Sequence, residues 1–197
     1  MTPERREKLL NVLNKRQPGL TVVMENVHDP HNISAVMRTC ESVGIQDIYV
    51  LTTKIAKHKR FGVKSSSSAA KWLTIHQHTD AAACFAELRK NYDTILTTHL
   101  ATDSIGLYEI DFTKKVALVF GNEHDGVSDE IRAMADGNFI IPQMGIIQSL
   151  NISVACAVSV YEALRQKQAA GQYEQTSLPP DRVEVLLKEW GFTENDL

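Results

Sequence analysis

The sequence lacks the features that mark several common classes of protein. Its three cysteines, Cys40, Cys84 and Cys156, are odd in number and far apart, so neither a disulfide framework nor a thiolate metal site is indicated. No apolar run approaches the roughly 20 residues that a membrane span needs. The first residues are basic but no apolar stretch follows them, which argues against a secretory signal. We therefore expect a reduced, cytoplasmic protein with no membrane partner.

Familiar nucleotide-binding and metal-binding motifs are also missing. No Gly-x-Gly-x-x-Gly follows the first predicted strand, no Walker loop ends in Gly-Lys-Ser/Thr, and no His-Glu-x-x-His occurs. His76 and His78 form the only tight pair of histidines. Alternating histidines on an exposed strand are a simpler interpretation than a metal site, so we predict no bound metal.

Positive charge is not in excess, but it is unevenly distributed. The chain has 21 Lys and Arg against 24 Asp and Glu, and a net charge of −3 by itself argues against a nucleic acid partner. The segment 54–71 nevertheless holds basic residues and no acid, and the first predicted helix is also basic. Segregated charge can bind a polyanion on one face, although solvated surface charge is the alternative. The candidate RNA-contacting residues are Arg5, Arg6, Lys57, Lys59, Arg60 and Lys64.

Apolar strands alternate with amphipathic helices along the chain. The runs 20–24 and 116–120 are short, apolar and rich in β-branched residues, whereas 32–43 repeats its apolar residues at helical spacing. Further strands are predicted at 47–51, 94–98 and 139–141, and further helices at 81–90, 128–135, about 151–168 and near the C-terminus. This alternation indicates one α/β domain with a mostly parallel sheet and helices on both faces.

Ligands of such sheets bind where the strands end, and three segments there carry candidate site residues. The first holds Asn32, which can cap the following helix, and Arg38, which lies nearly opposite the apolar stripe of that helix. An accessible guanidinium among small residues suits a planar or anionic group. An ordinary surface arginine is the simpler alternative.

The second segment, residues 120–128, joins an apolar strand to a predicted helix that Ser128 can cap. It begins with Gly121, Asn122 and Glu123 and contains a second glycine, Gly126. Glycines let the backbone approach a ligand closely and expose its N–H groups. A plain connection with an Asp-Gly turn is the alternative.

The third segment, residues 140–153, places apolar residues in what must be a loop, because Pro142 and Gly145 interrupt any regular element. Such residues suit a pocket for an adenine ring or a partner subunit. Ser149 and Asn151 follow at the start of the next predicted helix. They either present a hydroxyl and an amide to a ligand or simply cap the helix.

Together and in this order, the three segments resemble the SPOUT class of RNA methyltransferases and its SpoU-type ribose 2′-O branch, over roughly residues 20–164. The matching motifs are Asn32 with Arg38, Gly121-Asn122-Glu123, and Ser149-Leu150-Asn151. The basic N-terminal helix, Thr98-His99-Leu100 and the C-terminal helical extension look like the subgroup that methylates the tRNA D-loop guanosine to Gm18. The stretch 64–72 departs from a common family pattern, with serines where glycines are frequent.

The resemblance implies a deep trefoil knot (α/β-knot) in the C-terminal half of the sheet. Residues 1–18 are then a basic helix that contacts tRNA, 19–169 the methyltransferase domain, and 170–197 a helical extension. It implies S-adenosylmethionine as cofactor, S-adenosylhomocysteine as product, and a homodimer with its active site at the subunit interface. The implied catalytic residues are Arg38, Asn32, Glu123, Ser149 and Asn151. The implied cofactor-binding residues are Thr98, His99, Gly121, Asn122, Ile141, Met144 and Leu150.

Three other functions are compatible with parts of this pattern. A ribose methyltransferase of the same family that acts on rRNA would carry the same motifs. A non-catalytic RNA-binding protein is disfavoured because Arg38, Glu123 and Asn151 occur together. A small-molecule α/β enzyme is disfavoured because the Rossmann and Walker motifs are absent.

Overall fold

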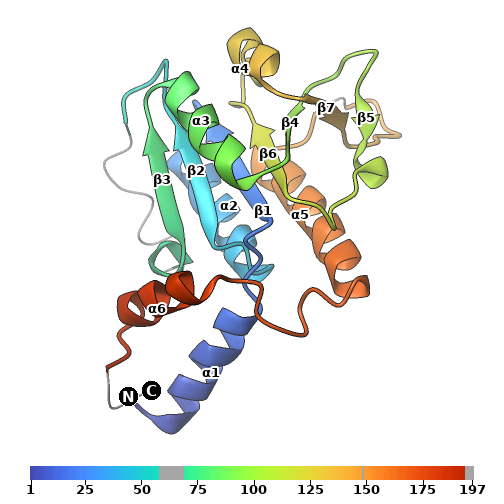
Figure 1. Cartoon of the computed structure of the whole chain (residues 1–197). Helices are drawn as coiled ribbons and strands as arrows, with labels where there is room; N and C mark the ends of the chain where they lie inside the picture. Colours follow the sequence, from blue (N-terminus) through green and yellow to red (C-terminus); the bar gives the residue numbers. More distant parts are fainter. Residues whose placement is uncertain (58–68, 148, 194–197) are drawn as a thin grey trace.

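The computed structural model describes residues 1–57, 69–147 and 149–193 of the chain, and Figure 1 shows their arrangement. Among these residues, seven strands form one sheet in the order β3-β2-β1-β6-β4-β7-β5, and each neighbouring pair is parallel. The predicted parallel α/β sheet is therefore confirmed. The strands are β1 (Leu20–Glu25), β2 (Asp47–Leu51), β3 (Thr74–His78), β4 (Thr94–Thr98), β5 (Ile105–Gly106), β6 (Val116–Phe120) and β7 (Gly137–Ile140).

Helices cover both faces of the sheet. They are α1 (Pro3–Asn14), α2 (Pro30–Ser42), α3 (Ala81–Asn91), α4 (Asp129–Met134), α5 (Ile152–Ala169) and α6 (Pro180–Glu189), with short 3-10 turns η1 (Ala69–Trp72) and η2 (Leu107–Glu109). Val22 points to the layer formed by α2 and α5, whereas its neighbour Val23 points to the layer formed by α3 and α4. This alternation is what a strand buried on both faces requires.

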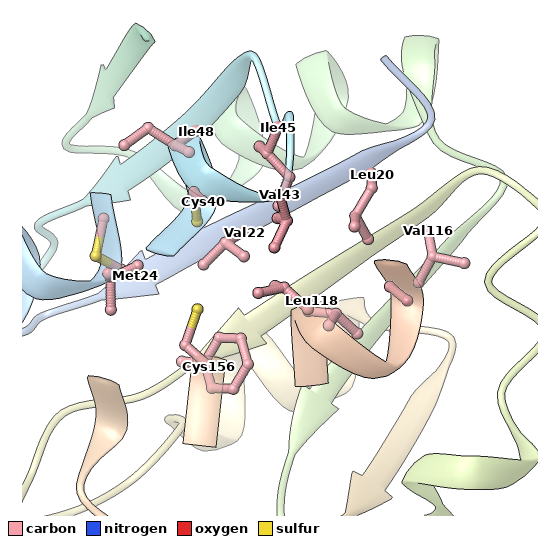
Figure 2. Packing of buried hydrophobic residues seen from close by; sticks show 14 of the residues in the cluster. Leu20, Val22, Met24, Cys40, Val43, Ile45, Ile48, Val116, Leu118 and Cys156 are labelled. Carbon is pink, nitrogen blue, oxygen red and sulfur yellow. The ribbon is translucent and has the colours of Figure 1, made fainter. Parts of the chain in front are cut away.

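The first layer is the larger of the two, and Figure 2 shows its packing around Val22 and Leu118. Cys40 of α2 and Cys156 of α5 are fully buried in it and are free thiols. Burial and the neighbouring Cys156 raise the pKa of the Cys40 thiol, with the hydrogen bond to Cys156 as the first cause. These cysteines therefore behave as small apolar core residues.

The beginnings of α2 and α5 differ in how far the sequence predicted them. Asp29, not Asn32, caps α2: its side chain accepts the backbone N–H of His31 at 2.8 Å, and Pro30 begins the helix. The prediction for Asn32 is therefore wrong, because a proline at the first helical position moves the cap one residue before it. Asn151 does cap α5, accepting the backbone N–H of Ser153 at 2.8 Å.

The two terminal helices form one unit. Leu9 and Leu13 of α1 pack with Leu186 and Leu187 of α6 and with Trp190 in a small cluster of their own. Figure 1 shows α1 and α6 at the end of the molecule where β1 begins, whereas α4 lies at the opposite end. The carboxyl ends of the strands, where a ligand site is expected, are thus far from the basic N-terminal helix.

Candidate active site

A chain of side-chain hydrogen bonds joins the three predicted motifs. Glu123, after β6, accepts the amide N–H of Asn32 at 2.7 Å through Oε1, and its Oε2 accepts the backbone N–H of His28 at 3.4 Å. The Oδ1 atom of Asn32 in turn accepts a hydrogen bond of 3.2 Å from Nδ2 of Asn151. One residue from each motif therefore contributes to one network at the carboxyl ends of β1 and β6.

Asn32 and Asn151 owe their places in this network to local structure. Asn32 lies in the first turn of α2, where capping by Asp29 leaves its own amide available to Glu123. Asn151 uses Oδ1 for the cap of α5 and Nδ2 for Asn32. The predicted cap is therefore confirmed for Asn151, and its amide group also binds Asn32; that it presents this amide to a ligand stays a prediction.

Glu123 is held as a carboxylate by these contacts. Partial burial raises its pKa, but the hydrogen bonds from Asn32 and from the backbone N–H groups of Glu123, His28 and Asp29 lower it more. The net pKa lies below the ordinary value of 4.5. Glu123 is thus a charged anchor at neutral pH, which fixes the loop after β6 against α2.

We expect Glu123→Gln to lower the free energy of unfolding at pH 7, because glutamine lacks the charge and one acceptor. A depressed carboxylate pKa stabilises the fold above the ordinary pKa, and this contribution disappears as pH falls through the folded pKa. The difference between wild type and variant should therefore shrink below about pH 4.5. Urea unfolding at pH 7 and pH 4 measures it, with exposed Glu184→Gln as control. A difference that grew towards low pH would contradict the anchor role.

A cavity of about 620 Å³ lies next to this network. That volume is within the range of about 300–1,000 Å³ typical of ligand pockets. Its walls are apolar at Phe120, Phe139 and Ile152, and polar groups stand at its edges. Glu123 and Ser149 from the predicted catalytic set line the cavity. Six of the seven predicted cofactor-binding residues also line it: Thr98, His99, Gly121, Asn122, Ile141 and Leu150.

Gly121 shapes the wall of the cavity. A Cβ atom at Gly121 would lie 1.9 Å from the backbone carbon of Gly126, so the position admits only glycine. This close approach allows Asn122 and Gly126 to pair through two backbone hydrogen bonds of 3.2 Å. The side-chain oxygen of Asn122 then accepts the backbone N–H groups of His124 and Asp125, each at 2.8 Å. The loop is therefore a tightly closed turn.

Some predicted residues lie elsewhere. Met144 is 96% exposed and is not among the residues that line the cavity. Arg38 does not line the cavity either, and its side chain is exposed on α2. It lies six residues after Asn32, which is about 9 Å along the helix axis at a rise of about 1.5 Å per residue. Lys59, Arg60 and Lys64 lie outside the described residues. Arg5 and Lys57 are exposed, and Arg6 is half-buried on α1. The roles of all these residues stay predictions.

The structure adds residues that the sequence analysis did not single out. Glu25, at the end of β1, is buried and accepts the backbone N–H of Ser128 at 2.9 Å, which fixes the start of α4. Arg132 of α4 donates to the ring of His99, so α4 supports the cavity wall from behind. The backbone N–H of His28 donates to Glu123, His124 directly follows Glu123 in the sequence, and the two histidine rings are in contact. Glu25 was signalled only by its position after an apolar strand.

The alternating histidines of β3 do not lie exposed, as predicted, but half-buried in a polar cluster. The two ring nitrogens of His76 are each 2.9 Å from a carboxylate, of Asp47 and of Glu87. His78 is 3.2 Å from Glu87, and the ring of His76 stacks on Tyr49. The residues that cover β3 come from α3 and β2, which strand periodicity alone does not reveal. Among the described residues, no group of His, Cys, Asp or Glu has a metal-binding arrangement.

A parallel α/β sheet with a ligand-sized cavity beyond its carboxyl strand ends places the chain in the class of ligand-binding α/β proteins. Comparison with known proteins narrows this class: residues 19–161 match the model of the SpoU rRNA Methylase family. The chain belongs to this family, and the predicted SpoU-type methyltransferase is confirmed.

Individual relatives match over nearly the whole chain. A tRNA (guanosine(18)-2′-O)-methyltransferase of Thermus thermophilus is 40% identical over 96% of this chain and 96% of its own length. One from Escherichia coli is 37% identical over 98% of this chain and 84% of its own. The solved structure of a TrmH/SpoU tRNA-modifying enzyme of A. aeolicus superposes with a TM-score of 0.87, at 36% identity, over 95% of this chain and 94% of that one. No helix among the described residues is long and apolar enough to cross a membrane.

Proposed function

We propose that this chain is an S-adenosylmethionine-dependent methyltransferase that methylates the ribose 2′-hydroxyl of guanosine 18 in the D-loop of tRNA. The observation that carries the proposal is the network of Glu123, Asn32 and Asn151 at the mouth of the cavity, because it unites three distant motifs at one site. The relatives named for guanosine 18 also match beyond the sheet, over the segments of α1 and α6. This full-length match favours tRNA over rRNA as substrate.

The cavity fits such a cofactor. Apolar walls at Phe139 and Ile141 suit an adenine ring, and Thr98 and Ser149 offer hydroxyl groups to a ribose. Space is open around the backbone of Gly126 and Gly145, so a ligand can approach the main chain there. When bound, S-adenosylmethionine supplies a methyl group on a sulfonium and is released as S-adenosylhomocysteine.

The residues of the chain then have three tasks: to bind, to orient and to handle one proton. Arginine stays protonated in proteins, so Arg38 stabilises the developing negative charge on the 2′-oxygen while water takes the proton. Asn32 and Asn151 orient the ribose, and Glu123 fixes Asn32. Orientation contributes because an in-line attack requires the oxygen and the methyl carbon in near contact.

A homodimer is part of the proposal. Three exposed apolar residues of the loop after β7 continue into a stripe on α5: Met144, Ile146 and Ile147 are 96%, 100% and 72% exposed, and Val154 and Tyr161 follow at 46% and 52%. Val154 and Tyr161 are seven residues apart and share a helix face. Such a patch suits a subunit interface next to the site. The proposal also includes a trefoil knot in the C-terminal half of the sheet. It includes a cytoplasmic location as well, because the proposed substrate is tRNA.

The decisive experiment is transfer of labelled methyl from S-adenosylmethionine to unmodified tRNA transcripts, followed by digestion and identification of the product nucleoside. We expect 2′-O-methylguanosine from the D-loop. A transcript with adenosine at position 18 is the matched control. Transfer to rRNA but not to tRNA would replace the substrate assignment, and absence of cofactor binding would overturn the methyltransferase mechanism for this chain.

The basic segment 54–71 is our candidate for contacts to the tRNA backbone, which position a substrate without reading its sequence. We expect replacement of Lys57, Lys59 and Arg60 by alanine to weaken tRNA binding. The slope of log affinity against log salt should flatten by about 1 for each cation that no longer neutralises a phosphate. Filter binding from low to moderate salt measures both quantities, with Lys90→Ala on α3 as control. An unchanged slope would assign these charges to solvated surface.

A further inference from the structure

Two histidine rings meet at the border between the cavity and α2. His28 follows β1 and His124 follows β6, and their ring centroids are 5.9 Å apart at an angle of 63°, an edge-to-face pair. Both side chains are exposed. His124 lines the cavity, whereas His28 is not among its lining residues. The pair therefore lies next to the cavity and next to Glu123, which also binds Asn32.

The backbone positions of both rings are fixed by the site itself. Glu123 directly precedes His124, and its Oε2 atom accepts the backbone N–H of His28 at 3.4 Å. Asn122 accepts the backbone N–H of His124 at 2.8 Å. The rings are thus held next to the network that orients the ribose, and their backbones cannot separate unless these hydrogen bonds break.

Proteins recognise the loops of a folded RNA largely through nucleotides that are splayed out of their base stack. Proteins that bind such splayed nucleotides stack the base on aromatic side chains, including histidine. Of the other aromatic rings that line the cavity, Phe120 and Phe139 are buried, and His99 accepts from Arg132. Within the described lining, His124 is therefore the exposed ring on which a base can stack.

The charges around the pair favour a base over a phosphate. Asp29 follows His28, Asp125 follows His124, and Glu123 precedes it, and all three carboxylates are exposed. Three acids next to two imidazoles repel a phosphate but leave a neutral base unaffected.

We propose that His28 and His124 form a stacking platform for the base of the target guanosine and hold the nucleotide with its 2′-hydroxyl towards the cavity. This inference rests on the proposed function. The platform positions the substrate and takes no part in the proton transfer.

The first test compares variants in steady-state methyl transfer. The double variant with both His28→Ala and His124→Ala should lower kcat/KM for tRNA by roughly 5- to 150-fold, the range for loss of one base stack. Affinity for S-adenosylmethionine should change by less than about two-fold. His28→Phe/His124→Phe should restore most activity, because phenylalanine stacks, whereas His28→Gln/His124→Gln should not. Rescue by glutamine alone, or a comparable loss of cofactor affinity, would overturn the platform.

The second test removes the base instead of the rings. A tRNA with an abasic riboside at position 18 keeps the 2′-hydroxyl, and wild type should use it roughly 5- to 150-fold less well than guanosine. The double alanine variant should have lost this preference. If the double alanine variant kept its full preference for guanosine, the stacking role would be refuted and the proposed function would stand. No transfer by wild type to the guanosine substrate would instead refute the proposed function, and the platform with it.

Discussion

Replacement of Arg38 by alanine should lower methyl-transfer turnover at least ~100-fold and leave S-adenosylmethionine binding nearly unchanged. The expected magnitude is that for loss of one electrostatic group that acts on the charge of the transition state. Cofactor binding should persist because Arg38 does not line the cavity. Folding should persist because the side chain is exposed on α2, and α2 is held by its buried apolar face.

Single-turnover kinetics together with equilibrium binding of the cofactor separate these effects. Arg38→Lys is the matched control: it keeps the charge but loses the planar fork, so its turnover should lie between wild type and Arg38→Ala. The pH profile adds a further criterion. If Arg38 stays protonated and does not take up the proton, wild type and Arg38→Lys should show the same slope of log rate against pH. Near-normal turnover of Arg38→Ala would end the assignment of Arg38 to the chemistry.

The sheet was predictable where burial leaves a direct trace in the sequence. All six positions of β1 are buried, and the apolar and β-branched run over residues 20–24 is what such a strand requires. β5 was not predicted, because Ile105 and Gly106 form only two residues of strand and owe their place to pairing with β7. Its stability comes from a neighbour that is distant in sequence, and no local pattern records that.

The candidate site shows the same division. Ser128 was correctly predicted as the cap of α4, since a cap depends on its own residue type and its immediate neighbours. The contact between Glu123 and Asn32 joins residues 91 positions apart. Periodicity cannot place such a contact, and only the order of the motifs suggested it. The ring pair of His28 and His124 was not predicted for the same reason.

The loop after β6 is where the backbone itself limits the function most severely. Gly121→Ala would place a Cβ atom 1.9 Å from the carbon and 2.1 Å from the oxygen of Gly126, and 2.1 Å from the nitrogen of Val127. These are backbone atoms and cannot rotate away, so the turn must open and its pairing between Asn122 and Gly126 must break. We expect the free energy of unfolding to fall by about 3 kcal/mol, which is at the upper end of the range for overpacked sites.

The same variant should bind S-adenosylmethionine at least ~100-fold more weakly, because an equilibrium that disfavours the closed turn by about 3 kcal/mol reduces the competent population to that extent. Gly126→Ala is the matched comparison in the same loop. Gly126 has φ of +68° but open space around its Cβ position, so alanine there should cost only about 1–2 kcal/mol of strain. Calorimetric titration and urea unfolding of both variants test the order. If Gly121→Ala bound the cofactor as well as Gly126→Ala does, the turn would not need to stay closed, and the cavity wall would not depend on the approach of residue 121 to residue 126.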